Sequence, residues 1–322
     1  MIWLVEIGNV TNEVLSRDEY FGQQVPIAIF VFLFSAFFAV FYTIVILAIR
    51  NDSDYKKFRA YRIMVHIGVA DIIQLIIHFS SGIYILDGGE HYGWLETIIG
   101  ATMNGAWCTM LALSILLNWN RFSSIIFAWS SDRIFSSTKT TIYLGFCWLT
   151  FLLFFVIDMT PLSKETYVVP LYTWHYEDGR PLSYIIRVVS NRLVVVEVIC
   201  SILCYGSIFA YIYFKHAILS KKEMYLTIQV LSLGAFHILC FLLWEYWFLP
   251  DTPLATFFGH FIWMFWNAIS PVLHVTISPR IRADVLNFLG FRRSTSVGIL
   301  SIAPNGKNSM DDLRRRSSSF MN

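Results

Sequence analysis

Long apolar stretches separated by short polar loops make up about half of this chain. Each stretch is roughly 21 to 24 residues long, and a helix rises about 1.5 Å per residue, so each can cross the ~30 Å hydrocarbon core of a bilayer. The apolar runs are continuous rather than alternating, which is typical of helices and not of barrel strands. We predict seven membrane-spanning helices, near residues 26–49, 63–86, 97–119, 141–161, 193–214, 226–249 and 255–277.

The composition supports this interpretation. Hydrophobic residues make up 56% of the 322 residues and charged residues only 14%, which is too apolar for an ordinary soluble domain. We therefore predict an all-α membrane protein, a seven-transmembrane helix bundle, whose surroundings are a lipid bilayer and whose partners include no nucleic acid. Its parts are an N-terminal tail (1–25), the bundle (26–277), a short surface helix (278–290) and a disordered tail (291–322).

The charges of the loops predict the orientation. An odd number of spans places the two ends of the chain on opposite sides, and 19 of the 24 Lys and Arg residues fall on the side of the C-terminal tail. Because basic loops stay in the cytoplasm, we expect the N-terminus outside. The outer side then carries 13 acidic and five basic residues, an excess of negative charge that favours cations near its mouth. Asn9, in an Asn-x-Thr sequence, is a candidate glycosylation site there.

Polar residues inside a span are costly, so their positions are informative. In the second span, Asp71, Gln74, His78 and Ser81 fall within an arc of about 80° and form one stripe that we expect to face the bundle interior. Asp71 lies near the middle of the membrane. It is either a carboxyl group that changes partner or ionisation state as the helices move, or a hydrogen-bonded packing residue kept neutral by burial.

The third span carries a similar stripe that ends at its cytoplasmic edge. Asn104, Ser114, Asn118 and Arg121 lie within about 100° of one another. Arg121 either extends to the lipid headgroups or forms a lock that bonds neighbouring helix ends in one state and a partner protein in another.

The seventh span contains a predicted hinge. Asn267 lies near its inner third, and Pro271 removes one backbone hydrogen bond, which should kink the helix. After it, Ile281 and Val285 recur at helical spacing opposite polar residues, and Gly290 suits a helix C-terminus. We predict a short amphipathic helix on the inner membrane surface.

Taken together, these positions resemble the plan of the rhodopsin-like G-protein-coupled receptors. Four features appear in order on the expected helices: the Gly-Val-Ala-Asp sequence that ends at Asp71, the Asn-Arg-Phe triplet of Asn120 and Arg121, Trp148, and the Ser-Pro-Val-Leu-His sequence that ends at His274. The resemblance implies that Asp71, Asn120, Arg121, Asn267, Pro271 and His274 form the switch and the G-protein coupling region.

The variants of these motifs resemble a narrower group, the nematode serpentine chemoreceptors, with class T as first choice and class X as second. The Asn-Arg-Phe triplet, the Tyr-Arg-Ile-Met sequence that begins at Tyr61 and the Ser-Pro-Arg-Ile-Arg sequence after the last span carry this likeness. It implies a receptor, not an enzyme, that binds a small environmental molecule and signals through a heterotrimeric G protein. It also implies a multi-pass protein of the plasma membrane, including that of sensory cilia, without a cofactor.

Two departures from the rhodopsin-like pattern stand out. The helix 3 cysteine of that family is replaced by Glu96, and the loop 162–192 contains no cysteine to pair with it. All five cysteines fall inside predicted spans, so we expect no loop disulfide. Asn120 replaces the acid that would pair with Arg121, so the lock must be built differently or be weak.

A ligand pocket in such a bundle opens between the helices on the outer half. The candidate ligand-binding residues by depth are His78, Tyr84, Asn104, Trp107, Glu197, Trp244, Glu245, His260 and Trp263. For the aromatic residues, the alternative is a belt at the membrane interface. For Glu197, the alternatives are an ion pair with Arg192 or Arg187 and a site for a cationic ligand.

The same residues bear on other functions of membrane proteins. A retinal-binding opsin needs a Schiff-base lysine in the last span, and 255–277 contains none. A zinc hydrolase needs clustered ligands, and the histidines of the spans are scattered, so we predict no metal site. A membrane transporter or ligand-gated channel remains the alternative, although the internal repeats typical of transporters are not visible.

Overall fold

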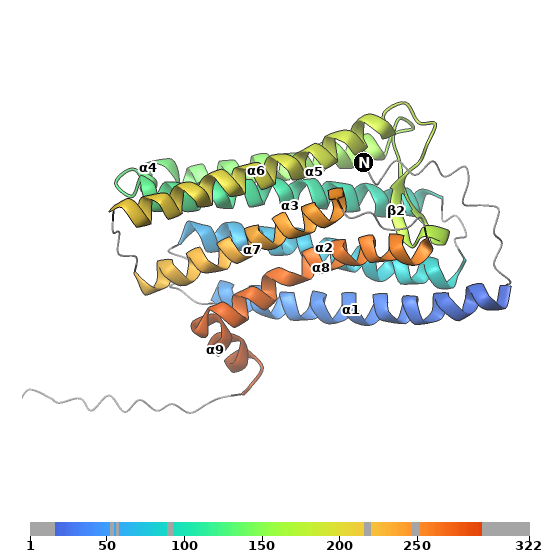
Figure 1. Cartoon of the computed structure of the whole chain (residues 1–322), viewed down its shortest axis with the longest axis horizontal. Coiled ribbons are helices and arrows are strands. Elements are labelled where there is room, and N and C mark those ends of the chain that lie inside the picture. The colour runs from blue at the N-terminus through green and yellow to red at the C-terminus, as the bar shows by residue number, and fades with distance from the viewer. Residues whose placement is uncertain are drawn as a thin grey trace, which may run out of the picture.

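The computed structural model describes residues 17–51, 55, 58–88, 93–215, 220–246 and 252–291. Within these residues, long helices run side by side along the longest axis of the molecule (Figure 1). A β-hairpin lies at one end of the bundle and a short helix, α9, at the other, and we call these the hairpin end and the α9 end. The glycosylation candidate Asn9 and the predicted disordered tail beyond residue 291 lie outside the described residues.

The long helices of the described chain correspond to the seven predicted spans. They are α1 (Arg17–Asn51), α2 (Arg59–Leu86), α3 (Trp94–Ile126), α5 (Ser137–Asp158), α6 (Ser183–Lys215), α7 (Lys221–Tyr246) and α8 (Pro253–Ile277). The shorter elements are α4 (Ser131–Ile134), β1 (Glu165–Val168), the 3₁₀ turn η3 (Val169–Leu171), β2 (Thr173–Tyr176) and α9 (Pro279–Phe288).

By length and composition, six of the described helices can cross a membrane, and a seventh span is reached when α8 and α9 are counted as one bent pair. The bend between these two helices is 103°. Ser278 separates them, and its side chain accepts a hydrogen bond from the backbone N–H of Ile281 to start α9. The prediction of a short helix after the last span is confirmed, and Gly290 follows it at a φ of 81° that favours glycine.

Two helices begin earlier than the hydrophobic pattern predicted. α1 begins at Arg17, nine residues before position 26, with Pro26 inside the helix. α6 begins at Ser183, ten residues before position 193, and this first part carries Arg187, Asn191 and Arg192. Apolar length locates the membrane-embedded part of a helix, whereas backbone hydrogen bonding continues into the polar region beyond it.

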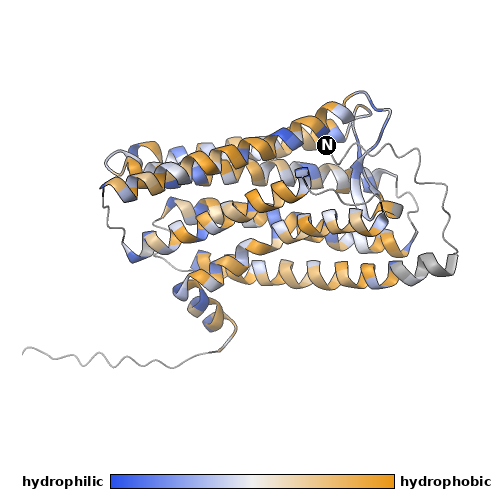
Figure 2. Ribbon diagram, viewed as in Figure 1, coloured by the Kyte–Doolittle hydropathy of each residue, from blue (hydrophilic) through white to orange (hydrophobic). Residues whose placement is uncertain are grey.

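The outside of the bundle is apolar. Leu33 on α1 is 68% exposed, Phe146 on α5 is 64% exposed and Leu203 on α6 is 64% exposed. Figure 2 shows hydrophobic residues along the length of α1 and α6. A surface of this kind is unfavourable in water and is suited to contact with lipid chains.

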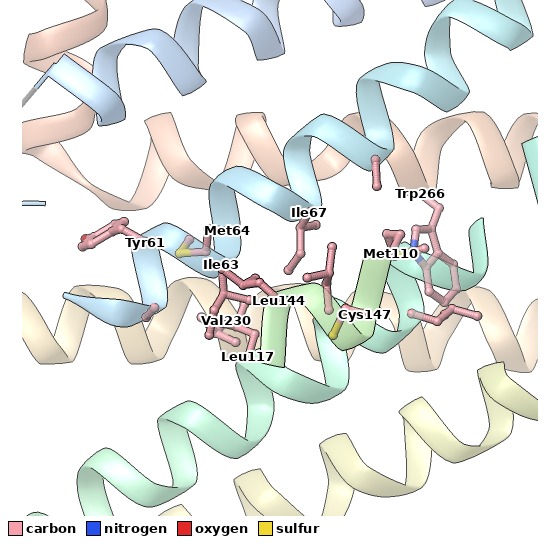
Figure 3. Close-up of a cluster of buried hydrophobic side chains, with 14 of the residues drawn as sticks. Tyr61, Ile63, Met64, Ile67, Met110, Leu117, Leu144, Cys147, Val230 and Trp266 are labelled. Atoms are coloured by element: carbon pink, nitrogen blue, oxygen red, sulfur yellow. The ribbon is translucent and has the colours of Figure 1, made fainter. Parts of the chain in front are cut away.

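The centre of the bundle is built around α3, which packs against α2, α5 and α6. Figure 3 shows part of this core, where Ile67 of α2, Leu117 of α3 and Leu144 of α5 meet. Cys147 is buried in the same cluster, and all five cysteines are free thiols in this structure.

Candidate ligand-binding site

The β-hairpin turns inward at its end of the bundle. Strands β1 and β2 pair antiparallel, with Glu165 opposite Tyr176. Trp174 of β2 is 2% exposed, and its indole N–H donates to the hydroxyl of Ser81 on α2 at 2.9 Å. Its ring also makes an edge contact with Tyr84, at 5.9 Å between centroids. The hairpin is therefore part of the packed interior, not a loop in solvent.

A polar pair holds the other strand to α3. The ammonium group of Lys164, just before β1, lies 3.1 Å from the carboxylate of Glu96, whose side chain is 3% exposed. One turn along α3, the carbonyl oxygen of Glu165 lies so near Gly100 that a Cβ there would clash with it. Glu96 is the residue that replaces the expected helix 3 cysteine, so an ion pair joins the two segments that a disulfide would join.

A pocket of about 690 Å³ of empty space, part of it open to solvent, lies between the hairpin and helices α3, α6, α7 and α8. Its aromatic wall consists of Trp107, Trp174, Tyr176, Trp244 and Trp263. Its polar groups are Asn104, Glu165, His175, Arg187, Ser190 and Asn191. The pocket thus combines flat apolar surfaces with a few hydrogen-bonding groups, as small-molecule sites do.

The structure places four of the predicted ligand-binding residues on this pocket: Asn104, Trp107, Trp244 and Trp263. Glu245 lines an adjacent hollow between α6 and α7, which Trp244 and Arg187 also border. The indole of Trp263 donates to Gln74 on α2 at 3.0 Å, so its ring is held from behind.

Three further candidates lie beside the pocket but do not line it. The rings of His78 and His260 meet at 4.8 Å, and both side chains are fully buried. Tyr84 stacks on Tyr167 of the hairpin at 5.8 Å. These residues pack against or beneath the hairpin, where a ligand in the pocket would not reach them directly.

Glu197 makes contacts that the sequence did not predict. Its carboxylate does not pair with Arg192 or Arg187 and does not face the pocket. It lies 3.3 Å from Nδ1 of His237 on α7 and accepts a hydrogen bond from Ser201 at 3.0 Å. Glu197 lies inside the bundle, as its depth along α6 predicts. The rotation of α6 about its axis turns the side chain toward α7.

The side chain of Asn104 is held by two hydrogen bonds, one to a carboxylate and one from a hydroxyl. Its amide N–H donates to the Asp158 carboxylate on α5 at 2.6 Å, and its amide oxygen accepts from Ser190 on α6 at 3.1 Å. The hydroxyl of Tyr176 lies 3.4 Å from the same serine oxygen. One side of the pocket is therefore a hydrogen-bonded junction of three helices and β2.

The hairpin also contributes residues that sequence reasoning missed. Glu165 is 5% exposed, lines the pocket and has no hydrogen-bond partner for Oε2 among the described residues. Burial, followed by the charge of Asp158, raises the pKa of its carboxyl well above the usual range. Burial and then Arg187 lower the pKa of His175. The β-branched and aromatic residues within 165–168 and 173–176 are typical of strands, but four residues each give only a weak signal.

Stacked rings lead from the pocket toward the middle of the bundle. Trp107 contacts Trp266 at 5.3 Å, and Trp244 is parallel to Trp266 at 5.4 Å. Trp266 in turn stacks on His237 at 4.0 Å. The imidazole therefore contacts both a ring that touches the pocket wall and the carboxylate of Glu197.

Hydrogen bonds continue from Glu197 toward the α9 end. Ser201 bonds Glu197 and accepts from the amide of Asn118 on α3 at 2.8 Å. The hydroxyl of Tyr205 donates to the amide oxygen of Asn118 at 2.7 Å. This polar layer joins α3, α6 and α7 in the middle of an apolar bundle.

Arg121 lies at the α9 end of α3 and is buried. It is 2% exposed, and Nη2 donates to the hydroxyl of Thr227 on α7 at 2.9 Å. The side chain does not extend to the lipid surface, so the first of its two interpretations is wrong. The rhodopsin-like triplet has an acid next to this arginine, but here that position is Asn120. The neutral hydroxyl of Thr227 accepts the hydrogen bond from Arg121 instead.

The remaining switch candidates lie between α1, α2, α7 and α8. Asp71 is 1% exposed and lies beside Tyr42 of α1. The amide of Asn267 is 3.3 Å from Nε2 of His78, and Gln229 of α7 donates to the backbone carbonyl of His274 at 3.3 Å. The helix α8 continues through Pro271 to Ile277.

Comparison with known proteins agrees with this architecture. The sequence model of the family described as serpentine type 7TM GPCR chemoreceptor Srt matches residues 13–297. The crystal structure of squid rhodopsin superposes with a TM-score of 0.67 at 13% sequence identity, over 82% of this chain and 80% of that chain. At that identity the likeness shows the fold alone. A search of curated proteins found no match.

Proposed function

Because the chain belongs to the serpentine type 7TM GPCR chemoreceptor Srt family, we propose that it binds a small environmental molecule in the pocket beneath the hairpin and thereby activates a heterotrimeric G protein. The family membership confirms the first choice of class made from the motifs and makes the chain a membrane receptor, not an enzyme. The pocket, its residues and the route of activation are the proposal.

One observation carries the proposal: a series of contacts that involves four helices, α3, α6, α7 and α8, leads from the pocket to Asn118, three residues before Arg121. The wall residue Trp244 stacks on Trp266, Trp266 on His237, and His237 contacts Glu197. The hydrogen bonds through Ser201 and Asn118 continue this series toward Arg121, three residues further along α3. A ligand that shifts Trp244 would change the position of α7 relative to α3 and α6.

Movement of α7 bears on Arg121 because α7 also supplies Thr227. The bond between Arg121 and Thr227 closes the α9 end between α3 and α7 in this structure. Separation of the two helices would break it and free a guanidinium group, which can bond backbone carbonyls or carboxylates of a partner. Asp71, Asn120, Asn267, Pro271 and His274 complete the switch that we propose in this half of the bundle.

We propose that the hairpin end faces the outside of the plasma membrane, or of a sensory cilium, and the α9 end faces the cytoplasm. The supporting observation is the distribution of basic residues: Arg50, Arg59 and Lys139 all lie at ends of helices that are on the α9 side. Asn9 would then be exposed to the glycosylation machinery. The alternative of a transporter gains no support, since the described helices contain a single bent pair, at the end of α8, and transporter sites use paired broken helices.

A ligand screen tests the proposal. Cells that express the full chain with a promiscuous G protein are exposed to small water-soluble and volatile molecules, and intracellular calcium is recorded. We expect at least one molecule to give a saturable response that Trp244→Ala removes and that Trp94→Ala, a change at a 73% exposed residue at the start of α3 that does not line the pocket, leaves intact. Responses that are equal in both variants would contradict the assignment of the pocket.

A further inference from the structure

The pocket has an unusual combination of walls and charge. Four tryptophans and one tyrosine surround it, and the carboxyl group of Glu165 lies at its border. The face of an indole ring carries negative electrostatic potential and attracts cations, most strongly when water is excluded. Neutral ligands gain from such rings through apolar contact, ring stacking and hydrogen bonds, but without this attraction between charge and ring face.

The carboxyl group of Glu165 is buried and only partly hydrogen bonded. Its side chain comes from β1, which Lys164 and the close approach to Gly100 hold against α3. The residue is 5% exposed, and Oε2 has no hydrogen-bond partner among the described residues. Lys164 does not satisfy it, because that ammonium group bonds Glu96. A buried carboxyl oxygen without a hydrogen-bond partner costs free energy that a bound donor or cation would recover.

A second acid strengthens the negative potential at this place. Asp158 is fully buried at the end of α5, and its charge acts directly on Glu165. Asn104 occupies only Oδ2 of Asp158, and Oδ1 has no hydrogen-bond partner among the described residues. Two acids therefore lie in this region: Glu165 lines the pocket directly, and Asp158 lies behind Asn104.

The basic residue of the pocket lies on another element. The guanidinium carbon of Arg187, on the first turns of α6, is 5.6 Å from the centre of the Tyr184 ring. Tyr184 is 61% exposed, and Arg187 also borders the adjacent hollow toward α7, so it stands at the opening. Arg187 therefore does not neutralise the charge of the Glu165 carboxylate.

We propose that the pocket binds a small organic cation, a protonated amine or a quaternary ammonium compound, between the Glu165 carboxylate and the faces of the surrounding tryptophans. This inference rests on the proposed function, because it names the chemical class of the ligand for the same pocket. The excess of acidic residues on that side of the chain would concentrate such cations near the opening.

Direct binding to the purified full chain in lipid nanodiscs tests this inference without any G protein. The probes are alkylammonium ions and choline, each paired with its uncharged carbon isostere, such as 3,3-dimethylbutan-1-ol for choline, and binding is followed by tryptophan fluorescence. We expect at least one cation to bind about tenfold or more tightly than its isostere. Equal affinity within every pair, or no saturable binding by any cation, would overturn the proposal.

Two substitutions locate the effect. Glu165→Gln keeps the shape and removes the charge, and we expect it to abolish the preference for the cation over its isostere. The control is Glu177→Gln, an exposed carboxylate in the same loop that pairs with Arg180 and does not line the pocket, which should leave the preference unchanged. A preference retained in Glu165→Gln would contradict the role of this residue.

A second variant keeps the test decisive if Glu165→Gln is poorly folded. Trp107→Phe retains an aromatic ring with a weaker attraction for cations. It should lower the affinity for the cation several-fold more than the affinity for its isostere, whereas equal losses would overturn the proposal. A receptor that responds to neutral molecules and binds no cation would disprove this inference and leave the proposed function standing.

Discussion

The ammonium group of Lys164 lies 3.1 Å from the carboxylate of Glu96, and this contact joins the start of the β-hairpin to the first turn of α3. Both groups are largely removed from water, with side chains that are 15% and 3% exposed. Glu96 stands at the position where the rhodopsin-like pattern has the helix 3 cysteine. The β-hairpin is therefore held to α3 by a reversible, charge-dependent contact.

This contact should contribute to stability. Lys164→Met removes one partner and leaves the Glu96 carboxylate buried with less compensation, which we expect to cost on the order of 2 kcal/mol. The measurement is the thermal unfolding midpoint of the purified receptor in detergent. Arg180→Met, which breaks an exposed pair with Glu177, is the matched control and should cost less than about 1 kcal/mol. Equal midpoints for the two variants would show that the Glu96 pair does not hold the hairpin.

The polar layer between α6 and α7 should transmit activation rather than bind ligand. Glu197→Gln weakens the contact with His237 but leaves the pocket wall intact. We expect ligand affinity to change less than about threefold while the maximal G-protein response falls by tenfold or so. Cys204→Ala, on the same helix, should change neither quantity. A large loss of affinity in Glu197→Gln with a normal maximal response would restore the original interpretation of Glu197 as a ligand contact.

The bond between Arg121 and Thr227 should restrain the inactive state. Thr227→Val has nearly the same shape but cannot accept the hydrogen bond from Nη2. We expect a several-fold rise in ligand-independent G-protein activation, because loss of the bond favours separation of α3 and α7. Thr276→Val, a change on α8 that removes a hydroxyl bonded only to its own helix, serves as control. Unchanged or lower basal activity in Thr227→Val would argue against the lock.

The pocket should bind a permanent cation more weakly as the pH falls. Because burial and Asp158 raise the pKa of the Glu165 carboxyl, it is neutral at low pH and gains its negative charge only as the pH rises through that raised value. The lowered pKa of His175 keeps this residue neutral until more acidic pH, where its protonation would add repulsion of the same sign. We expect the affinity for a quaternary ammonium probe, measured by titration over the pH range in which the receptor stays folded, to drop by roughly 3–10-fold as the pH falls through that raised pKa.

The other titratable and charged groups near Glu165 do not reverse this sign. They are Cys108, Asp158, Tyr176 and Arg187. Protonation of Asp158 would remove negative charge in the same direction, and burial raises the pKa of Tyr176 so that it stays neutral. Glu165→Gln should flatten the pH profile, and a profile as steep as that of the original chain would assign the effect to another group.

The helices of this fold could be predicted from the sequence because membrane helices must be long, apolar and internally hydrogen bonded. The stripe of Asp71, Gln74 and His78 on α2 was recognised for the same reason, and all three side chains are buried. The short strands could not be recognised in this way. Their four-residue lengths carry little periodic signal, and they are stabilised by distant partners such as the Ser81 hydroxyl, which bonds Trp174.

Rotation about a helix axis limited the prediction of the site. Trp107, Trp244 and Trp263 were placed at the correct depth and also face the pocket. Glu197 was chosen by depth alone, and its partner His237 lies 40 residues further along the chain on α7. Glu165 was missed because an acidic residue in a loop is ordinarily exposed, and only the inward fold of the hairpin buries it.

The central claim is that occupation of the pocket activates a G protein through Arg121. The most direct measurement is ligand-driven nucleotide exchange on a heterotrimeric G protein, with the receptor in nanodiscs, for the original chain and for Arg121→Ala. We predict that Arg121→Ala is expressed at the cell surface and binds ligand normally but gives no exchange above background. Undiminished ligand-driven exchange in Arg121→Ala would contradict the account.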